Sequence, residues 1–533
     1  MKPTPEQQKV IDLGSQGKSL KVEAYAGCGK TATLVNTARA IKGKGLYLAF
    51  NRANALEAKK KFKGFADAAT IHSLAYQAVG VNFGDRVEGE LAGKLSAYRL
   101  VQFFNYAALG PITPLGRATL IRETLSNWMN SAAELPETQH VPMEQAQLAA
   151  QAANQNLSRP AMLAEVIAKD TRKLWEEIIT GGSLPLPHDG YLKIFALQKP
   201  VFPCDYILFD EAQDGNEMMM ELIRSQPCQQ IYVGDGFQSI YSFRGAVNIL
   251  AQITDLPTCH LSQSFRFGTE IADRANVVLE CLGAKVPLKG FDTDRTELGQ
   301  RSAMLFRSNT TIFSELLVQV LKNKRKVAVV GGTKDMAQVL RAVESLKAGE
   351  ETPHPDFVGF SRWEQYIEAA EIPGAPADMV RLVKVCKSNP VKALRYALQL
   401  SDRVKEHEAD IVVSTAHKSK GREWPYVRLG NDLYRPDNSP EAEEPFQEEE
   451  ARLDYVALTR GQVGMEGGEE MMAAFLERQA MLREGQLKDG VDLDINTLIR
   501  DLKSLPPKAR MERLTGLPSD IQGKLMARLQ QGA

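Results

Sequence analysis

Residues 20–31 read LKVEAYAGCGKT, and this stretch decides the fold. It opens with a short apolar run of strand length and continues into a glycine-rich loop that ends in Lys30 and Thr31. A loop of this kind holds the phosphates of a nucleotide with its backbone N–H groups and with the N-terminus of the following helix. A strand before the loop and a helix after it make the motif specific. We therefore predict a nucleotide-binding α/β domain.

The loop residues predict a site for ATP and Mg²⁺. Lys30 is expected to reach the β and γ phosphates, and the Thr31 hydroxyl is expected to bind Mg²⁺. The strict motif has Gly at the position of Ala24. Cys28 suggests a redox switch, and the alternative is that a small side chain is simply tolerated there. The residues predicted to line the nucleotide are Ala26, Gly27, Cys28, Gly29, Lys30, Thr31 and Ala32.

Short apolar runs recur along the chain and end in polar or glycine residues, as buried parallel strands do. Two sets of them predict two α/β domains. Residues 86–190 interrupt the first set and read as helical, and residues 335–405 interrupt the second. The predicted strands are 20–27, 45–50, 206–212 and 229–235 in the first set, and 302–308, 326–332, 410–416 and 426–430 in the second.

Polar side chains follow two of these strands, where ligands bind in open parallel sheets. Asp210 and Glu211 lie at the tip of the third run; Asp210 is predicted to hold Mg²⁺ and Glu211 to accept a proton from the attacking water. Gln238 follows the fourth run and is predicted to sense the γ-phosphate. A carboxylate pair alone could be mere solvation, but here it accompanies a phosphate loop.

Two aromatic residues and an arginine, Tyr241, Phe243 and Arg244, lie just beyond Gln238. Exposed aromatic rings beside an arginine suit the stacking of unpaired bases, and such stacking is indifferent to sequence. The alternative is that Tyr241 and Phe243 are core residues. We predict that this segment contacts single-stranded DNA.

Six ordered motifs resemble those of superfamily 1 helicases of the UvrD, Rep and PcrA type. Two further segments, TIHSLAY at 70–76 and HDGYLKI at 188–194, together with LSQSFRFG at 261–268, look closest to the F-box DNA helicase branch, although no F-box is recognisable. The six motifs are the phosphate loop, DEAQ (210–213), GDGFQSIYSFRGA (234–246), QSFRFG (263–268), TAHKSKGREW (415–424) and YVALTR (455–460).

The resemblance implies an α/β fold of two RecA-like P-loop motor domains with parallel sheets, each interrupted by a mainly helical insertion. Each of the resulting segments is expected to be a separate part of the motor. These are 1–85 with 191–260 (motor domain 1A), 86–190 (insertion 1B), 261–334 with 406–475 (motor domain 2A), 335–405 (reduced insertion 2B) and 476–533 (a helical tail of unknown role).

The resemblance also implies roles in the nucleotide site. Gln7 would read the adenine edge and Phe265 would stack on its face. Arg266 and Arg460 would act as arginine fingers, a contribution of roughly 10³ to 10⁵ in rate. Glu423 would hold the ribose.

For DNA, the resemblance adds contacts to those predicted from the residues. Phe50 and Asn51 would contact the strand, and His72 and His417 would lie near its backbone. A lone histidine at a strand end is more often a structural hydrogen-bonder than a ligand. Single-stranded DNA is the expected substrate, together with duplex/single-strand junctions.

The chain departs from the family pattern in its last motifs. Arg422 and Pro425 stand where the family has an apolar residue and an acid, and Gly461 stands where Ala is usual. The glycine- and acid-rich segment after Arg460 suggests a shortened last strand. None of these departures removes a predicted phosphate or Mg²⁺ contact.

Composition narrows the class of protein without deciding the substrate. The chain has 65 Lys and Arg against 66 Asp and Glu, so net charge neither supports nor excludes DNA binding. Its six cysteines lack metal-ligand spacing, and no apolar run is long enough to span a bilayer. We expect a cytoplasmic monomer, nucleoid-associated if bacterial or in the host cytoplasm if from a phage.

These features predict an ATP-dependent helicase or translocase that moves on single-stranded DNA, 3′ to 5′ by resemblance, in repair, recombination or replication. A recombinase or single-strand-binding protein is the expected partner. One rival is a helicase with a fused nuclease, for which the chain lacks a further carboxylate and lysine cluster. Another rival is a DNA-binding P-loop ATPase switch, or an anti-recombinase translocase, without robust unwinding.

Overall fold

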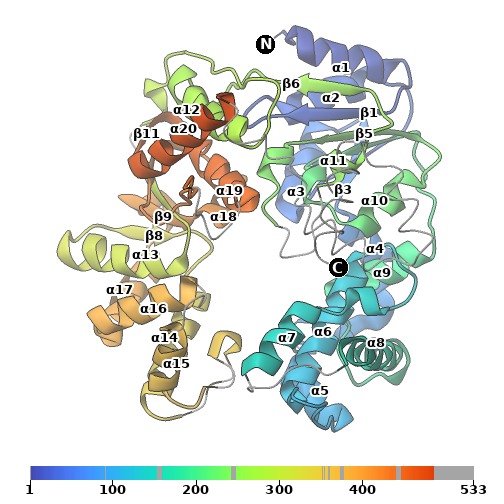
Figure 1. Cartoon of the computed structure of the whole chain (residues 1–533). Helices are drawn as coiled ribbons and strands as arrows, with labels where there is room; N and C mark the ends of the chain where they lie inside the picture. The colour runs from blue at the N-terminus through green and yellow to red at the C-terminus, as the bar shows by residue number, and fades with distance from the viewer. Residues whose placement is uncertain are drawn as a thin grey trace. The chain divides into compact units, whose positions relative to one another are not determined.

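The chain forms two compact units in this computed structural model, Met1–Phe265 and Arg266–Ala533. Each unit contains one parallel sheet with helices packed around it (Figure 1). The structure describes residues 2–89, 92–152, 159–241, 248–299, 301–350, 352, 354–357, 360–371, 377–439 and 446–484.

The first sheet has six strands, and all of its neighbouring strands run parallel. The four strands predicted in this unit are present, and two more were not predicted because they carry few large apolar side chains. In sheet order the strands are β3 (Ala66–Ala69), β2 (Gly45–Leu48), β4 (Tyr206–Phe209), β5 (Gln229–Gly234), β1 (Leu20–Ala24) and β6 (Thr258–Leu261).

Helices make up most of the remaining described part of this unit. Several begin at a side-chain cap; in α6, for example, Thr113 accepts a hydrogen bond from the backbone N–H of Gly116. The α-helices are α1 (Pro5–Ser15), α2 (Lys30–Ala40), α3 (Arg52–Lys61), α4 (Ile71–Ala78), α5 (Ala97–Phe104), α6 (Pro114–Asn130), α7 (Met143–Ala152), α8 (Pro160–Glu176), α9 (His188–Leu197), α10 (Glu217–Arg224) and α11 (Ile249–Gln252).

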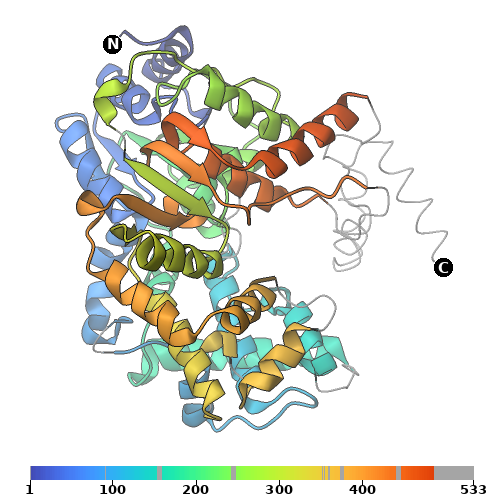
Figure 2. The same ribbon diagram turned by 90° about the vertical axis from the view of Figure 1, so that its left-hand side faces the viewer.

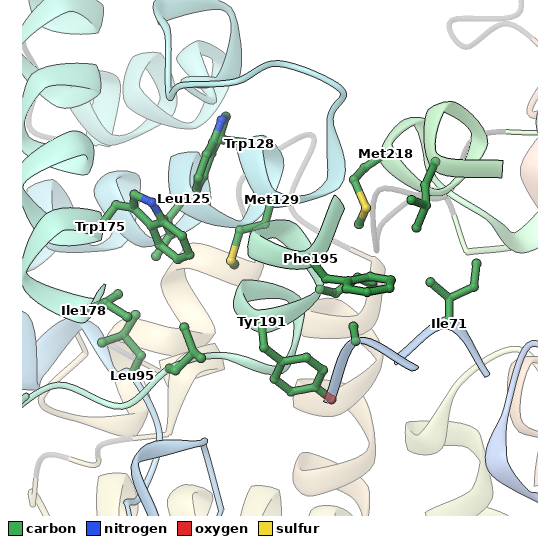
Figure 3. Packing of buried hydrophobic residues seen from close by; sticks show 14 of the residues in the cluster. Ile71, Leu95, Leu125, Trp128, Met129, Trp175, Ile178, Tyr191, Phe195 and Met218 are labelled. Atoms are coloured by element: carbon green, nitrogen blue, oxygen red, sulfur yellow. The ribbon is translucent and has the colours of Figure 1, made fainter. Parts of the chain in front are cut away.

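The helical segment between β3 and β4 shares one apolar core with the sheet. Trp128 of α6 packs edge-on against Trp175 of α8, with ring centroids 5.0 Å apart, and Figure 3 shows both rings near Leu125 and Met129. The same cluster continues through α9 to buried side chains of β2 and β4. The segment is therefore packed onto the sheet through continuous apolar contact, which stabilises both.

The second sheet has five parallel strands. Some of its strands, yellow-green to orange, can be followed in Figure 2. The four predicted strands are present, and the expected shortening after Arg460 is wrong, because β11 has six residues, the same length as β10. The register between these two strands shifts between Trp424 and Tyr426, where Pro425 has no N–H to donate. In sheet order the strands are β11 (Gly461–Glu466), β10 (Trp424–Leu429), β7 (Ser302–Phe306), β9 (Ile411–Thr415) and β8 (Val327–Val329).

Helices also separate β8 from β9 in the second unit, over the described part of residues 330–410. The segment has an apolar cluster that includes Trp363 and Leu394 and that continues into β7, β8 and β9. The α-helices of this unit are α12 (Thr269–Cys281), α13 (Asn309–Leu316), α14 (Lys334–Lys347), α15 (Trp363–Ala370), α16 (Ala377–Ser388), α17 (Val391–Asp402), α18 (Ala416–Ser419), α19 (Glu448–Leu458) and α20 (Glu469–Arg483).

The predicted start of a separate tail at residue 476 falls inside helix α20. This helix lies beside α12 (Figure 1), and Arg483 donates two hydrogen bonds, each 2.6 Å long, to the carboxylate of Glu280. Residues 476–483 therefore belong to the second unit, whereas 485–533 lie outside the described residues. The other predicted boundaries within the units stay predictions.

No helix among the described residues is both long enough and apolar enough to cross a membrane.

Candidate nucleotide and DNA site

The order of the first sheet brings three predicted functional loops to one edge. Strand β5 lies between β1 and β4, and all three run parallel. Their carboxyl ends therefore meet, and with them the phosphate loop after β1, the Asp210–Glu211 pair after β4 and the Asp235–Gln238 segment after β5. This edge is where open parallel sheets bind ligands.

The phosphate loop has the backbone that its sequence predicts. Gly27 and Gly29 adopt φ angles of 74° and 72°, a conformation that glycine reaches without steric cost. Helix α2 begins at Lys30, and no side chain caps its N-terminus. Its first N–H groups are thus suited to phosphate oxygens. Cys28 is buried, which favours the reading that a small side chain is tolerated there.

Lys30 and Glu211 meet at this edge. Nζ of Lys30 donates a hydrogen bond to Oε2 of Glu211 over 3.3 Å, and both side chains are largely buried. Burial works to lower the pKa of Lys30, but the nearby carboxylates of Glu211, Asp235 and Asp210 outweigh it and raise that pKa. The lysine is therefore held as a cation, ready for an anionic ligand.

Asp210 is buried beside Glu211 and is fixed from the neighbouring strand. The Tyr47 hydroxyl, on β2, donates a hydrogen bond to Oδ2 of Asp210, and the backbone N–H of Glu211 donates to Oδ1 over 3.0 Å. Burial and then the charge of Glu211 raise the pKa of Asp210 to about 6. A carboxylate in this setting suits a bound cation, which would add positive charge beside the neighbouring carboxylates.

Glu211 itself has an unusual backbone for a residue with a side chain. Its φ angle is 53° and its ψ angle 41°, in the left-handed region. Such a conformation costs roughly 1 kcal/mol or more outside glycine and is concentrated at functional sites. The turn it makes at the end of β4 directs its carboxylate to Lys30.

Gln213 links this carboxylate to the next strand, a role not predicted from the sequence. Its Nε2 donates to Oε2 of Glu211 over 2.7 Å, and its Oε1 accepts from the backbone N–H of Asp235 over 3.0 Å. Asp235 in turn accepts a hydrogen bond of 2.7 Å from the side chain of Gln238. Gln213 is the last residue of the DEAQ motif, so the sequence could have singled it out. Its hydrogen bonds could not be predicted, because they depend on which strands are neighbours in the fold.

The predicted adenine residues come together at the other side of the phosphate loop. Gln7 donates through Nε2 to the Cys28 carbonyl over 3.3 Å, and Phe265 donates through its backbone N–H to the Gly27 carbonyl over 2.9 Å. A Cβ added to Gly29 would lie 3.0 Å from Nε2 of Gln7 and 3.7 Å from the Phe265 ring. The structure thus gathers both predicted residues around one glycine.

Phe50 and Tyr241, two predicted DNA contacts, stack on each other. Their ring centroids are 6.0 Å apart with planes 9° from parallel, and 38% of Phe50 is exposed. Asn51 caps helix α3 by accepting from the backbone N–H of Asn54, so its oxygen has a structural role in this state. Phe243 and Arg244 lie outside the described residues.

His72 lies in the first turn of helix α4, which follows the carboxyl end of β3. Its Nε2 is 3.0 Å from Oδ1 of Asp189, and its ring meets Tyr191 edge-on. These contacts join α4 to α9. The His72 ring therefore has the partners expected of a structural hydrogen-bonding histidine. About a third of the side chain remains exposed.

Three predicted residues of the second unit lie near one another, because Arg266 also donates to the carbonyl of Thr459, the residue before Arg460. Arg266 donates through Nε to Oε2 of Glu423 over 2.7 Å, and Oε1 of the same carboxylate accepts from Gln462 over 3.0 Å. Arg460 is buried, and its guanidinium donates to carbonyl and hydroxyl oxygens of its own unit, among them Val456 O over 2.8 Å. His417 lies in α18, directly after β9, and is half-buried.

Comparisons with known proteins agree with this arrangement. The family model described as AAA domain matches residues 7–244, and the model described as UvrD-like helicase C-terminal domain matches residues 356–464. F-box DNA helicase protein 1 of Schizosaccharomyces pombe is 30% identical over 508 residues, which cover 86% of this chain and 56% of the relative. By these matches the chain is similar to the UvrD-like superfamily 1 helicases.

Two further relatives fit the same family. F-box DNA helicase 1 of Gallus gallus is 29% identical over 502 residues, covering 86% of this chain and 48% of the relative. ATP-dependent DNA helicase PcrA of Leuconostoc citreum is 37% identical over 93 residues, covering 16% of this chain and 12% of the relative. The chain spans about half the length of the two F-box DNA helicases it matches.

For this UvrD-like chain the predicted fold class is confirmed. Its two parallel sheets are those of two RecA-like motor domains, each with helices inserted between strands. The match to the AAA domain model contains the phosphate loop, Asp210, Glu211 and Gln238. The match to the helicase C-terminal model contains Glu423 and Arg460.

Proposed function

We propose that this protein is an ATP-dependent helicase or translocase that moves on single-stranded DNA. One observation carries the proposal. The Lys30–Glu211 pair lies after β1 and β4, while the stacked rings of Phe50 and Tyr241 follow β2 and β5 of the same sheet. A site for phosphate chemistry and a surface for stacking bases are thus built from neighbouring strand ends.

The phosphate loop, residues 26–32, holds the phosphates of the nucleotide. Gln7 and Phe265 contact its adenine base. Lys30, freed from Glu211, pairs with the β and γ phosphates. Thr31 and Asp210 both offer the oxygen ligands that Mg²⁺ prefers. The Thr31 hydroxyl has no hydrogen-bond partner among the described residues. Bound there, Mg²⁺ would neutralise charge that develops on the phosphates.

Glu211 accepts the proton of the attacking water, and Gln238 follows the state of the γ-phosphate. Their positions support this assignment, because Glu211 is joined through Gln213 and Asp235 to Gln238 by hydrogen bonds of 2.7 to 3.0 Å. The arginine-finger roles of Arg266 and Arg460 and the ribose role of Glu423 rest on the resemblance of their motifs.

Bases of the strand stack on Phe50 and Tyr241, with Phe243, Arg244, Asn51, His72 and His417 as further contacts. Movement from 3′ to 5′, action at duplex/single-strand junctions, and a role in repair, recombination or replication rest on the resemblance of the motifs. So does a recombinase or single-strand-binding protein as partner. A cytoplasmic monomer is the expectation drawn from the composition.

ATP hydrolysis with and without single-stranded DNA tests the proposal, with Glu211→Gln beside the wild-type protein. We expect strong stimulation by DNA in the wild type and loss of turnover in Glu211→Gln, with nucleotide binding retained. Low salt is needed, because phosphate contacts weaken steeply as salt rises. Turnover that DNA leaves unchanged would favour an ATPase switch instead.

Strand displacement separates a helicase from a translocase that does not unwind. A duplex with a 3′ single-stranded tail and its 5′-tailed counterpart are compared at saturating ATP. Unwinding of the 3′-tailed duplex alone supports the proposed polarity. DNA-stimulated hydrolysis without unwinding of either duplex would support the translocase alternative, for which removal of a recombinase filament is the matching assay.

A further inference from the structure

Gln213 is a fully buried side chain that joins the ends of two strands. Its amide nitrogen donates to the Glu211 carboxylate after β4, and its amide oxygen accepts from the Asp235 backbone after β5. A primary amide suits this position, because it carries a donor and an acceptor at opposite sides of one plane. A carboxylate or an apolar side chain of the same size would satisfy at most one of the two partners.

The backbone of Gln213 is tied to the same segment. The hydroxyl of Ser239 donates to the Gln213 carbonyl over 3.1 Å. Asp235 is therefore hydrogen-bonded to the side chain of Gln213, and Ser239 is hydrogen-bonded to the main chain of Gln213. Two residues after Ser239 the chain reaches Tyr241, whose ring stacks on Phe50.

The end of β5 packs closely against this amide. A Cβ added to Gly234 would lie 2.1 Å from Oε1 of Gln213, so only glycine leaves room for the side chain at the end of β5. In a close-packed, fully buried setting, a shift of the Asp235–Ser239 segment has to move the amide or break its hydrogen bonds. Either event changes what Glu211 contacts.

We propose that Gln213 is a positioning residue that transmits DNA binding at Phe50 and Tyr241 to the carboxylate of Glu211. The proposal rests on the proposed function of this site and adds the route by which DNA raises the rate of ATP hydrolysis. DNA that engages Tyr241 moves the segment 235–239, and Gln213 then orients Oε2 of Glu211 for proton transfer.

Gln213→Met tests the route, because it keeps the volume and removes all three side-chain hydrogen bonds, to Glu211, Asp235 and Asp214. Gln213→Asn is the second variant, since it stays polar but is too short to reach both partners. Gln226→Met is the matched control: Gln226 is another buried glutamine of this unit with three hydrogen bonds, to Phe202 N, Pro200 O and Leu222 O. All are made in the full chain.

Each protein is assayed for the maximal rate of ATP hydrolysis with and without an oligothymidylate strand, for the KM of ATP, and for oligothymidylate affinity by fluorescence anisotropy. We expect both Gln213 variants to lose about tenfold or more of the stimulation by DNA. The KM and the DNA affinity should stay within about threefold of wild type, and Gln226→Met should keep its stimulation.

Two results would overturn the route while leaving the proposed function intact: wild-type stimulation in the Gln213 variants, or an equal loss in Gln226→Met. A wild-type protein that binds the strand but shows no stimulation would overturn the proposed function, and the route with it.

Discussion

The hydroxyl of Tyr47 donates a hydrogen bond to Oδ2 of Asp210 from the adjacent strand. The pair is buried, and burial together with the charge of Asp210 raises the pKa of Tyr47, so the phenol stays a neutral donor. The carboxylate that we propose as a Mg²⁺ ligand is therefore held in one orientation before any nucleotide arrives. Such support around a metal ligand commonly decides how tightly the metal binds.

Replacing Tyr47 with Phe should weaken Mg²⁺ binding. Loss of a hydrogen bond to a metal-ligating group typically costs about 10- to 100-fold in metal affinity. The measurement is the Mg²⁺ dependence of the binding of a fluorescent, non-hydrolysable ATP analogue, followed by that of hydrolysis. Tyr206→Phe is the control, because Tyr206 is buried in the same sheet and its hydroxyl donates to the Phe65 carbonyl. Equal Mg²⁺ requirements in the two variants would contradict the assignment.

The left-handed backbone of Glu211 should be visible in stability. Glu211→Gly is expected to be more stable than Glu211→Ala by about 1 kcal/mol, because glycine adopts this conformation freely. The opposite order is expected at Glu57 in helix α3, where glycine costs about 1 kcal/mol relative to alanine. Urea unfolding of the four variants provides the comparison, and a shared order at both positions would argue against strain at Glu211.

Lys193 predicts a pH-dependent stability. Its Nζ is buried, donates to the carbonyls of Ser131 and Ala133 over 2.7 Å each, and lies over the Trp128 ring. Burial lowers the pKa of Lys193 to about 8. The unfolded chain, with an ordinary lysine pKa near 10.5, holds the proton over a higher range.

Between those two pKa values the unfolded state binds more protons, so stability rises with pH. The wild type should therefore gain up to about 3 kcal/mol relative to Lys193→Met as the pH rises from 8 to 10.5. The difference in the free energy of unfolding between the two proteins, measured in urea at several pH values, isolates this group. A difference that stays constant over this range would show that the lysine titrates normally.

The stacked rings of Phe50 and Tyr241 predict a loss of DNA affinity on truncation. Each of Phe50→Ala and Tyr241→Ala should weaken binding of single-stranded DNA by about 1 to 3 kcal/mol, and do so similarly for different base sequences. Tyr98→Ala is the control, since Tyr98 is 67% exposed in helix α5 and belongs to no proposed contact. If the control weakens binding as much, the two rings are not the platform.

Gly234→Ala should reproduce the defect of the Gln213 variants, because the new methyl group would occupy the position of the Gln213 amide oxygen. We expect loss of stimulation by DNA with ATP binding retained. Gly236→Ala tests the same loop at a less crowded place, where the nearest atom is the flexible end of Asn248 at 3.0 Å. The two variants should differ clearly in hydrolysis measured with DNA present.

Sequence patterns predicted those parts of the molecule that are encoded locally. The apolar runs marked eight strands, and the phosphate loop and the Asp210–Glu211 pair were placed at strand ends because parallel strands bring such ends together. The short β3 and β6 were missed, since ADAA and TCHL carry no clear apolar period. Tyr47 was also missed, because its partner lies 163 residues away in the sequence.

Other contacts could not be predicted because they join segments that lie far apart in the sequence. Gln213 is visible in DEAQ, but only the adjacency of β4 and β5 shows that it reaches Asp235. The boundary predicted at residue 476 falls inside α20, whose polar composition resembles a tail, whereas Arg483 and Gln479 of that helix bind Glu280 of α12. Contacts of this kind depend on the fold and have no local signature.

The position of β1 in the first sheet has a consequence for synthesis of the protein. Its only neighbours in the sheet are β5 and β6, which begin at Gln229 and Thr258. A nascent chain therefore exposes the edges of β1 until more than 200 later residues have been made, and closing so long a loop slows folding. Chains released early, before residue 229, would carry an unpaired apolar strand that favours aggregation and binding by chaperones.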